Sequence, residues 1–306
     1  METLMLVDGN HTAARAYFKY NLSTKGYPTG VIYGVINILK GLCNAWKPDE
    51  LIVLWDIGKS SYRCGLYEGY KKRPSLLGDD FRSQLEMLQK ILDDMGVVQL
   101  GIQAVEADDL FGIIINDKKL TNDYEKIIIV SSDHDLYQLI EGSRVIQYDP
   151  IKHKVFDELA LDRVEGLKPL QIIDFKALAG DTSDKIPGIG GIGKKTAKTL
   201  LKKYGSMNNF DFNEMNKKKS TEKIVSNWEL ALLFKKLTTI FTSTDMLNDF
   251  QKRVYEDWCE WYSDKRNFMR AKKEVLKESF RALDFKWAED IPNFLREFGK
   301  AIHRGD

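Results

Sequence analysis

Three short apolar segments that each run into an aspartate constrain this chain most. The segments and their aspartates are "LMLV" (4–7) with Asp8, "LIVLW" (51–55) with Asp56, and "IIIV" (127–130) with Asp133. Polar residues do not interrupt these segments, as is typical of strands buried on both faces of a parallel sheet. Segments with helical spacing lie between them. The alternation predicts an α/β domain with a mostly parallel, twisted sheet flanked by helices.

The aspartates follow the strands, so we expect them at the edge of the sheet where ligands bind. Asp135 lies two residues after Asp133, and Glu106, Asp108 and Asp109 follow the short segment "VVQLGI" and open a helix. Helix capping explains any one of these acids. It does not explain all of them, because unit charges about 4 Å apart repel by about 4 kcal/mol at an effective dielectric constant near 20. The group therefore requires protons or cations.

The ligand types indicate which cation this would be. The four histidines show no pairing with cysteine at the spacing of a zinc site. Ligation by oxygen alone favours a hard ion such as Mg²⁺ or Mn²⁺. Two such ions about 4 Å apart are the usual apparatus for attack of water on a phosphodiester.

Composition and net charge exclude few other classes of protein. The 306 residues carry a net charge of +1, so any interaction with nucleic acid must depend on where the charges lie. We find no signal peptide and no apolar run of membrane-spanning length. Three widely separated cysteines are typical of a reduced, cytoplasmic protein.

Beyond residue 165 the pattern becomes helical, over 168–179, 193–204, 228–241 and much of 250–306. The stretch "GIGGIGKKT" within it fits the dinucleotide pattern and nearly fits a P-loop. Both interpretations fail, because no strand precedes the glycines and Lys195 occupies the Ser/Thr position of a P-loop. A glycine-rich turn that opens a helix suits the phosphates of a nucleic acid instead. Residues 185–223 carry ten lysines and three acids, a net charge of +7, which supplies a basic face.

Six stretches in order resemble the 5′ nuclease or flap endonuclease family, which includes bacteriophage 5′–3′ exonucleases and the N-terminal domain of bacterial DNA polymerase I. They are "LMLVDGN", "WDIGKSSYR", "EGYK", "VEADDL", "SSDHDLYQL" and "GDTSDKIPGIGGIGKKTA". The resemblance implies a PIN-like nuclease core over 1–180, with a helical arch or clamp loop at 57–80. A helix–three-turn–helix DNA-binding region would cover 181–250, and a C-terminal helical extension 251–306. Aromatic residues in the extension suggest helices that pack back on the core.

By position, the resemblance also implies the site residues. The first metal group would be Asp8, Asp56, Glu106, Asp108 and Asp133. The second would be Asp109, Asp135, Asp181 and Asp184. Lys71 and Arg63 would contact the scissile phosphate, and Tyr70 would stack on a terminal base. The remaining DNA-binding positions would be Lys59, Lys72, Gly190, Gly193, Lys194, Lys195 and Lys198. His134 would tune the site without ligating, and the glycine-rich turn would hold a K⁺ ion.

We therefore expect a free-standing, monomeric, Mg²⁺- or Mn²⁺-dependent 5′–3′ exonuclease and flap endonuclease of bacterial or phage origin. Its substrates would be duplex DNA with a 5′ flap, nick or frayed end, and RNA–DNA hybrids from which primers are removed. Three alternatives remain open: a gap or flap endonuclease with little exonuclease activity, a non-catalytic duplex-binding protein, and an RNA-cleaving PIN-type nuclease. In a further alternative, the C-terminal segment binds a replication clamp or single-strand-binding protein.

Overall fold

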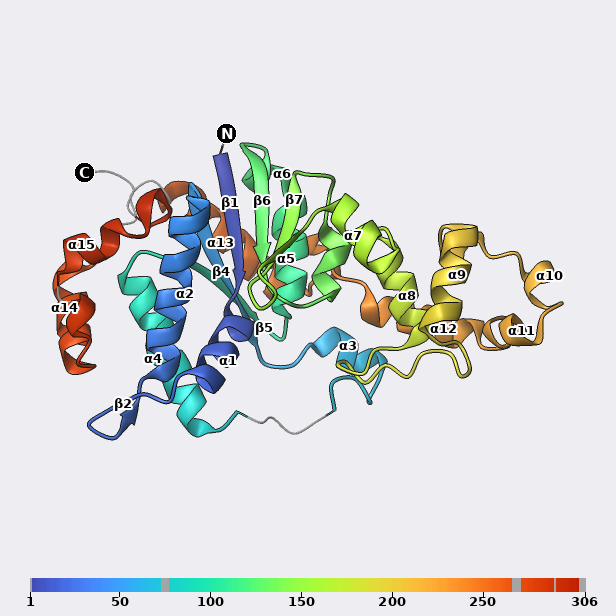
Figure 1. Cartoon of the computed structure of the whole chain (residues 1–306), viewed down its shortest axis with the longest axis horizontal. Coiled ribbons are helices and arrows are strands. Elements are labelled where there is room, and N and C mark those ends of the chain that lie inside the picture. The colour runs from blue at the N-terminus through green and yellow to red at the C-terminus, as the bar shows by residue number, and fades with distance from the viewer. Residues whose placement is uncertain (1, 73–76, 266–270, 289, 303–306) are drawn as a thin grey trace.

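A six-stranded sheet forms the centre of the computed structural model, which describes residues 2–72, 77–265, 271–288 and 290–302 (Figure 1). The strand order is β5-β4-β1-β6-β7-β8; β7 and β8 pair antiparallel, and the other neighbours pair parallel. The strands are β1 (Glu2–Asp8), β4 (Glu50–Ile57), β5 (Val98–Gln103), β6 (Tyr124–Val130), β7 (Val145–Asp149) and β8 (Lys154–Phe156). The predicted mostly parallel sheet is thus confirmed. A separate hairpin joins β2 (Ser23–Thr24) to β3 (Tyr27–Pro28).

Helices cover both faces of the sheet, which explains why the apolar runs of the strands are uninterrupted. Successive side chains of a strand point to opposite faces. Met5 and Val7 therefore belong to the core under one set of helices, and Leu4 and Leu6 to the core under the other. The first set comprises α1 (Gly9–Lys19), α2 (Gly30–Trp46) and α4 (Asp79–Asp94), and the second comprises α5 (Ala107–Asn116), α6 (Lys118–Thr121) and α13 (Asp249–Lys265).

The connections between strands create a switch point at the carboxyl edge of the sheet. From β1 the chain moves outward through β4 to β5, and it then returns to place β6 on the other side of β1. Helices leave the neighbouring strands in opposite directions at such a point, and this opens the crevice in which α/β proteins bind ligands. The aspartates that end β1 and follow β6 flank this crevice.

A helical region extends from one side of the sheet, at the right of Figure 1. Its helices are α7 (Glu158–Glu165), α8 (Gln171–Ala179), α9 (Lys194–Tyr204), α10 (Phe212–Met215), α11 (Lys219–Ser226) and α12 (Trp228–Thr238). Ala177, Leu200 and Phe234 lie in a core of this region's own. The short helix α3 (Ser61–Leu66) contributes Cys64 to its margin. The region thus packs against the loop that follows β4.

The C-terminal helices return to the sheet, as the aromatic pattern predicted. Phe280 of α14 (Lys273–Ala282) and Phe294 of α15 (Ile291–Arg296) belong to the same core as Val7. The backbone N–H of Lys272 donates to the carbonyl of Asp94, at 2.7 Å. Among the helices that the structure describes, none has the length and apolarity needed to cross a membrane.

Candidate active site

Acidic side chains converge at the carboxyl ends of four adjacent strands, β5, β4, β1 and β6. Asp8 ends β1 and caps α1, where its Oδ1 accepts from the N–H of His11 at 2.9 Å. Its Oδ2 accepts from Oγ of Ser131, which follows β6, at 3.0 Å. Asp56 accepts at 2.7 Å from the N–H of Ala107, the first residue of α5. Each carboxylate is therefore tied to a neighbouring strand or helix, as the topology predicted.

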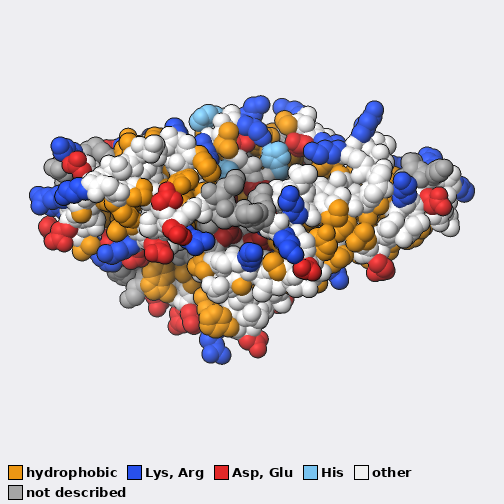
Figure 2. Space-filling view, turned by 90° about the horizontal axis from the view of Figure 1, so that it is seen from below, with side chains coloured by type: hydrophobic (Ala, Val, Ile, Leu, Met, Phe, Trp, Pro, Cys, Tyr) orange, Lys and Arg blue, Asp and Glu red, His pale blue; other side chains and the backbone are white. Residues whose placement is uncertain are grey.

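Three carboxylates form the tightest part of this group. Asp108, Asp133 and Asp135 each offer an oxygen, and these oxygens lie within 4.8 Å of one another. Asp133 also accepts from the N–H of Asp135 at 2.8 Å. On the face seen in Figure 2, acidic side chains lie near the middle, next to a group of lysine and arginine side chains. The cluster joins members of both predicted metal groups.

The surroundings of the group disfavour the charged form of its carboxylates. Burial, together with the neighbouring Asp56, raises the pKa of Asp8 from 3.8 to about 7. Loss of hydration and the proximity of Asp133 raise the pKa of Asp108 well above its usual value. Carboxylates whose charged form is so disfavoured are stabilised by a bound cation or by protons. Hard oxygen ligands without histidine or cysteine suit a divalent ion such as Mg²⁺ or Mn²⁺.

Lys71 contacts two members of the acidic group, one from each predicted metal group. Its Nζ is 2.6 Å from Oε1 of Glu106 and 3.7 Å from Oδ1 of Asp184. Its side chain is 38% exposed, so the protein encloses it only in part. Burial alone would raise the pKa of Glu106, but Lys71 and Arg63 outweigh it and lower that pKa.

Arg63 and Asp109 bind each other inside the protein, whereas the resemblance implied a phosphate contact for Arg63 and a metal-ligand role for Asp109. The guanidinium of Arg63 is 3% exposed and binds both oxygens of Asp109, at 2.6 and 2.8 Å. It also donates to Glu106 and to the carbonyls of Leu237 and Thr239. With its donors occupied inside the protein, Arg63 has none directed at a phosphate. Asp109, which is fully buried and also accepts from the N–H of Phe241, has no oxygen directed at a metal.

Tyr70 is a second correction, because its ring does not form a surface for a terminal base. The residue is 5% exposed, and the ring packs in the core of the helical region. Its hydroxyl lies 3.1 Å from both Glu106 Oε2 and Asp184 Oδ2. Tyr70 thus links one acid of each predicted metal group.

The second acidic group contains a lysine that the sequence analysis did not identify. Lys176 of α8 contacts the carboxylate of Asp135, and its Nζ is 2.6 Å from Oδ2 of Asp181. Burial would raise the pKa of Asp181, but Lys176 and hydrogen bonds from Ser183 lower it to about 2. The sequence signal is a single lysine in the otherwise apolar stretch "FKALAG" (175–180).

The described part of the loop after β4 contains one short helix, α3, instead of long arch helices. Lys59 precedes α3 and is exposed. Lys72 is exposed and pairs with Glu68 at 2.8 Å. The middle of the expected arch, residues 73–76, lies outside the described residues.

The glycine-rich turn before α9 has two kinds of glycine. Gly188 has a φ of 69°, and a Cβ there would lie 2.3 Å from the nitrogen of Gly180, so this position packs backbone against backbone. Gly190 and Gly193 are exposed, and a Cβ on either would meet open space. The backbone of these two residues is accessible to a phosphate group, as expected for a nucleic-acid contact.

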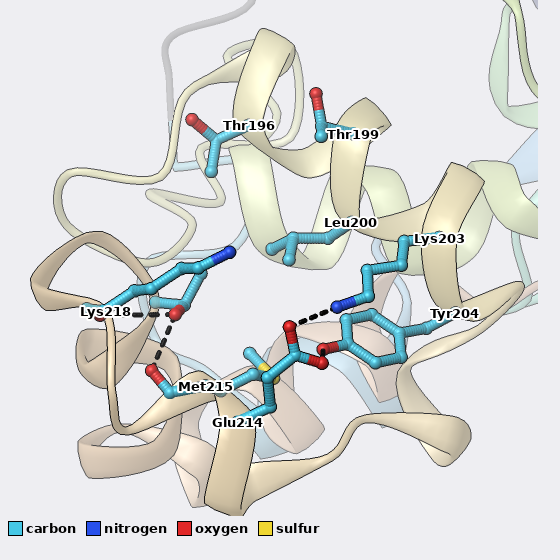
Figure 3. A pocket seen from close by; sticks show the side chains of 9 residues that line it. Thr196, Thr199, Leu200, Lys203, Tyr204, Glu214, Met215 and Lys218 are labelled. Atoms are coloured by element: carbon cyan, nitrogen blue, oxygen red, sulfur yellow. Dashed lines mark hydrogen bonds and ion pairs between the residues drawn. The ribbon is translucent and has the colours of Figure 1, made fainter.

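The lysines of α9 differ in availability. Lys194 and Lys195 are exposed in its first turn. Lys198 instead donates to the carbonyl of Glu165 at 2.5 Å and lies 3.2 Å from that residue's carboxylate. Figure 3 shows the later part of α9 beside α10, where Lys203 and Tyr204 both bind Glu214. The cavity there, of about 180 Å³, is thus closed on one side by an ion pair.

His134, between Asp133 and Asp135 in the sequence, contacts Tyr137 and Lys152. Its ring stacks on Tyr137, and its Nε2 lies 3.1 Å from Nζ of Lys152. Partial burial and the charge of Lys152 lower the pKa of His134. Ser131, which orients Asp8, was not predicted from the sequence, since a serine at the end of a strand carries no distinctive pattern.

Two family models together match most of this chain. The family model for the 5′-3′ exonuclease N-terminal resolvase-like domain matches residues 3–165, and that for the 5′-3′ exonuclease C-terminal SAM fold matches residues 167–260. The 5′-3′ exonuclease of Aquifex aeolicus is 34% identical over 231 residues, which cover 75% of this chain and 74% of that protein.

Longer relatives and solved structures extend the comparison. DNA polymerase I of Streptococcus pneumoniae is 32% identical over 94% of this chain, and the chain spans about a third (35%) of that polymerase. The bacteriophage T5 flap endonuclease, solved in a complex with DNA and metal ions, is 20% identical with a TM-score of 0.66. That alignment covers 96% of this chain and 100% of the phage protein, and it shows a shared fold. By its domain models and its relatives, the chain belongs to the 5′-3′ exonuclease family.

Proposed function

We propose that this protein is a divalent-metal-dependent 5′ nuclease that hydrolyses phosphodiester bonds near 5′ ends and single-strand/duplex junctions of DNA. One observation supports this most: carboxylates from four adjacent strand ends gather at one edge of the sheet, where Lys71 contacts Glu106 and Asp184. The acids Asp8, Asp108 and Asp133 are held by backbone or side-chain hydrogen bonds or lie in the cluster of three oxygens. Such preorganised negative charge favours bound cations over protons at neutral pH.

The donor set fits two hard ions. Asp8, Asp56, Glu106, Asp108 and Asp133 would hold one ion. Asp135, Asp181 and Asp184 would hold the other; Asp109 leaves this set because Arg63 occupies it. Bound Mg²⁺ or Mn²⁺ would supply the Lewis acidity that phosphodiester hydrolysis requires.

The chain's own residues would position the substrate. Lys71 is the accessible cation of the group and would move from Glu106 to the scissile phosphate, where it offsets the charge that develops. The exposed backbone at Gly190 and Gly193, with Lys194 and Lys195, would hold the duplex by its phosphates. We include a K⁺ ion bound by the carbonyls of this turn in the proposal. RNA–DNA hybrids are included as substrates because contacts to phosphate oxygens do not involve the 2′-hydroxyl that distinguishes RNA from DNA.

Cleavage assays test this function. The substrates are a 5′ flap, a nicked duplex and an RNA-primed duplex, each with Mg²⁺ and with EDTA. We expect cleavage that EDTA abolishes. The Asp133→Asn variant should bind duplex DNA but cleave it far more slowly than the parent protein does, because a neutral amide replaces one carboxylate of the cluster.

The products separate the alternatives. Mononucleotides from a blunt duplex indicate exonuclease activity, whereas cleavage confined to the flap junction indicates a gap or flap endonuclease. Duplex binding by the parent protein without any cleavage in Mg²⁺ or Mn²⁺ would contradict the proposal and favour a non-catalytic DNA-binding protein.

A further inference from the structure

The second acidic group contains a cation supplied by the protein itself. Lys176 lies in the last turn of α8, and its side chain is 12% exposed. The ammonium contacts the carboxylate of Asp135 and lies 2.6 Å from Oδ2 of Asp181. One lysine therefore bridges two of the three acids that we assign to the second ion.

The backbone fixes this bridge. Gly180 follows α8 with a φ of 82°, a conformation that glycine adopts without strain, and reverses the chain so that Asp181 faces Lys176. The backbone N–H groups of Asp181 and Ile186 each donate to the other's carbonyl at 2.8 Å. Oδ1 of Asp181 accepts from the N–H of Ser183 at 2.7 Å, which leaves Oδ2 directed at the lysine. Asp181 is thus held in place independently of Lys176.

The ammonium also borders the cluster of three carboxylates. Asp135 contacts Lys176, and it also offers an oxygen within 4.8 Å of oxygens of Asp108 and Asp133. A divalent ion bound by Asp135 and Asp181 would lie within a few ångströms of the ammonium, where like charges repel strongly. A lysine has a flexible stem, so its ammonium can leave when an ion enters.

We propose that Lys176 is the counter-cation of Asp135 and Asp181 in the metal-free protein, and that the second divalent ion binds in competition with it. This inference rests on the proposed function, since it presumes that these acids hold an ion. Lys176 then has two effects: it protects the metal-free site from repulsion between bare carboxylates, and it weakens the binding of the second ion.

Calorimetric titration of Mg²⁺ or Mn²⁺ into the full chain tests the proposal without any activity measurement. Lys176→Met removes the competing charge, so we expect the second ion to bind at least about tenfold more tightly than in the parent protein. Lys176→Gln, which keeps a hydrogen-bond donor, should behave similarly if the methionine variant folds poorly. Lys176→Arg retains the charge and should keep the weak second site. Unchanged or weaker binding of the second ion in both neutral variants would overturn the proposal.

Lys235→Met is the matched control. Lys235 of α12 lies 2.8 Å from Oδ1 of Asp174, a buried acid on the same helix as Lys176. Its removal also leaves an acid without its lysine, but away from the carboxylate cluster, so ion binding should match that of the parent protein. A parent protein that binds no divalent ion would contradict the proposed function. A parent protein with two ions, and neutral Lys176 variants that bind them as the control does, would contradict only the role of Lys176.

Discussion

Arg63 and Lys71 lie in the same loop, yet their surroundings give them different roles. Arg63 is almost fully buried and joins α3 to α5 and to the end of α12 through Asp109, Glu106 and two backbone carbonyls. Lys71 is partly exposed; its ammonium lies close to Glu106 and farther from Asp184. A planar guanidinium with five donors suits the first role, and a compact, mobile ammonium suits the second.

Arg63→Met should therefore act on stability. The substitution leaves Asp109 buried without its cation, so we expect the free energy of unfolding to fall by about 3–5 kcal/mol. Urea denaturation monitored by circular dichroism measures this. Arg82→Met is the control, because Arg82 is 70% exposed and its contact with Asp79 is 3.5 Å long. A variant with full stability but reduced cleavage would instead place Arg63 at the phosphate.

The pKa of Asp8 predicts how the metal-free protein responds to pH. Its pKa is about 7 in the folded protein against 3.8 ordinarily, so between these values the folded state holds a proton that the unfolded state has lost. Stability in EDTA should therefore fall as pH rises from 4 to 7. The raised pKa of Asp108 acts in the same direction.

Unfolding measured at pH 4, 5.5 and 7 with EDTA checks this dependence. Asp8→Asn should flatten it, because the amide does not titrate, and added Mg²⁺ should restore stability at pH 7 by neutralising the carboxylates. An Asp8→Asn variant whose stability depends on pH as that of the parent protein does would contradict the assignment.

At the scale of single elements, different glycines of the turn before α9 contribute to stability and to DNA binding. Gly188→Ala should destabilise the protein, because φ is 69° and the added Cβ would meet the backbone of Gly180. Gly190→Ala should leave stability within about 0.5 kcal/mol, because open space surrounds that position. The new methyl group would instead keep phosphates from the exposed backbone. In thermal unfolding, Gly188→Ala should lose stability, and in duplex-binding assays Gly190→Ala should lose affinity. A destabilised Gly190→Ala protein would contradict this difference.

Salt dependence should distinguish the lysines of α9. Each phosphate contact contributes about 0.9 to the slope of log K against log salt concentration. Lys194→Ala should lower that slope by about this amount, because the side chain is exposed in the first turn. Lys198→Ala should lower it less, because Glu165 already binds that ammonium. Equal effects on duplex binding, titrated at several salt concentrations, would show that Lys198 leaves Glu165 for DNA.

Elements and acids were predictable from the sequence to the extent that they depend on local patterns. Uninterrupted apolar runs located β1, β4 and β6, and the strand ends located Asp8, Asp56 and Asp133. The partners of Arg63 and Tyr70 were not predictable, because the sequence pattern of a basic or aromatic residue in a loop does not differ between one that faces solvent and one that faces a buried acid. The role of Lys176 was not predictable for a related reason. Its two acids, Asp135 and Asp181, lie after a strand distant in sequence and in the turn after its own helix.

At the scale of the whole molecule, the C-terminal helices belong to the core of the sheet. Phe280 and Leu276 of α14 are fully buried in the cluster that contains Val7 and Val53 of the central strands. The hydroxyl of Thr24, in the hairpin after α1, donates to the carbonyl of Leu283 at 2.8 Å. Segments from both ends of the chain thus share one packed interior, so they should unfold together.

Phe280→Ala tests this cooperativity. Loss of a fully buried phenylalanine should lower the free energy of global unfolding by about 3–5 kcal/mol, since the cavity opens in the shared core. Val275→Ala, on the same helix but 39% exposed, should cost far less. Hydrogen exchange locates the effect: amides of β1 and β4 should lose protection in step with those of α14. If only α14 lost protection while the strands kept theirs, the C-terminal helices would be an independent addition to the nuclease core.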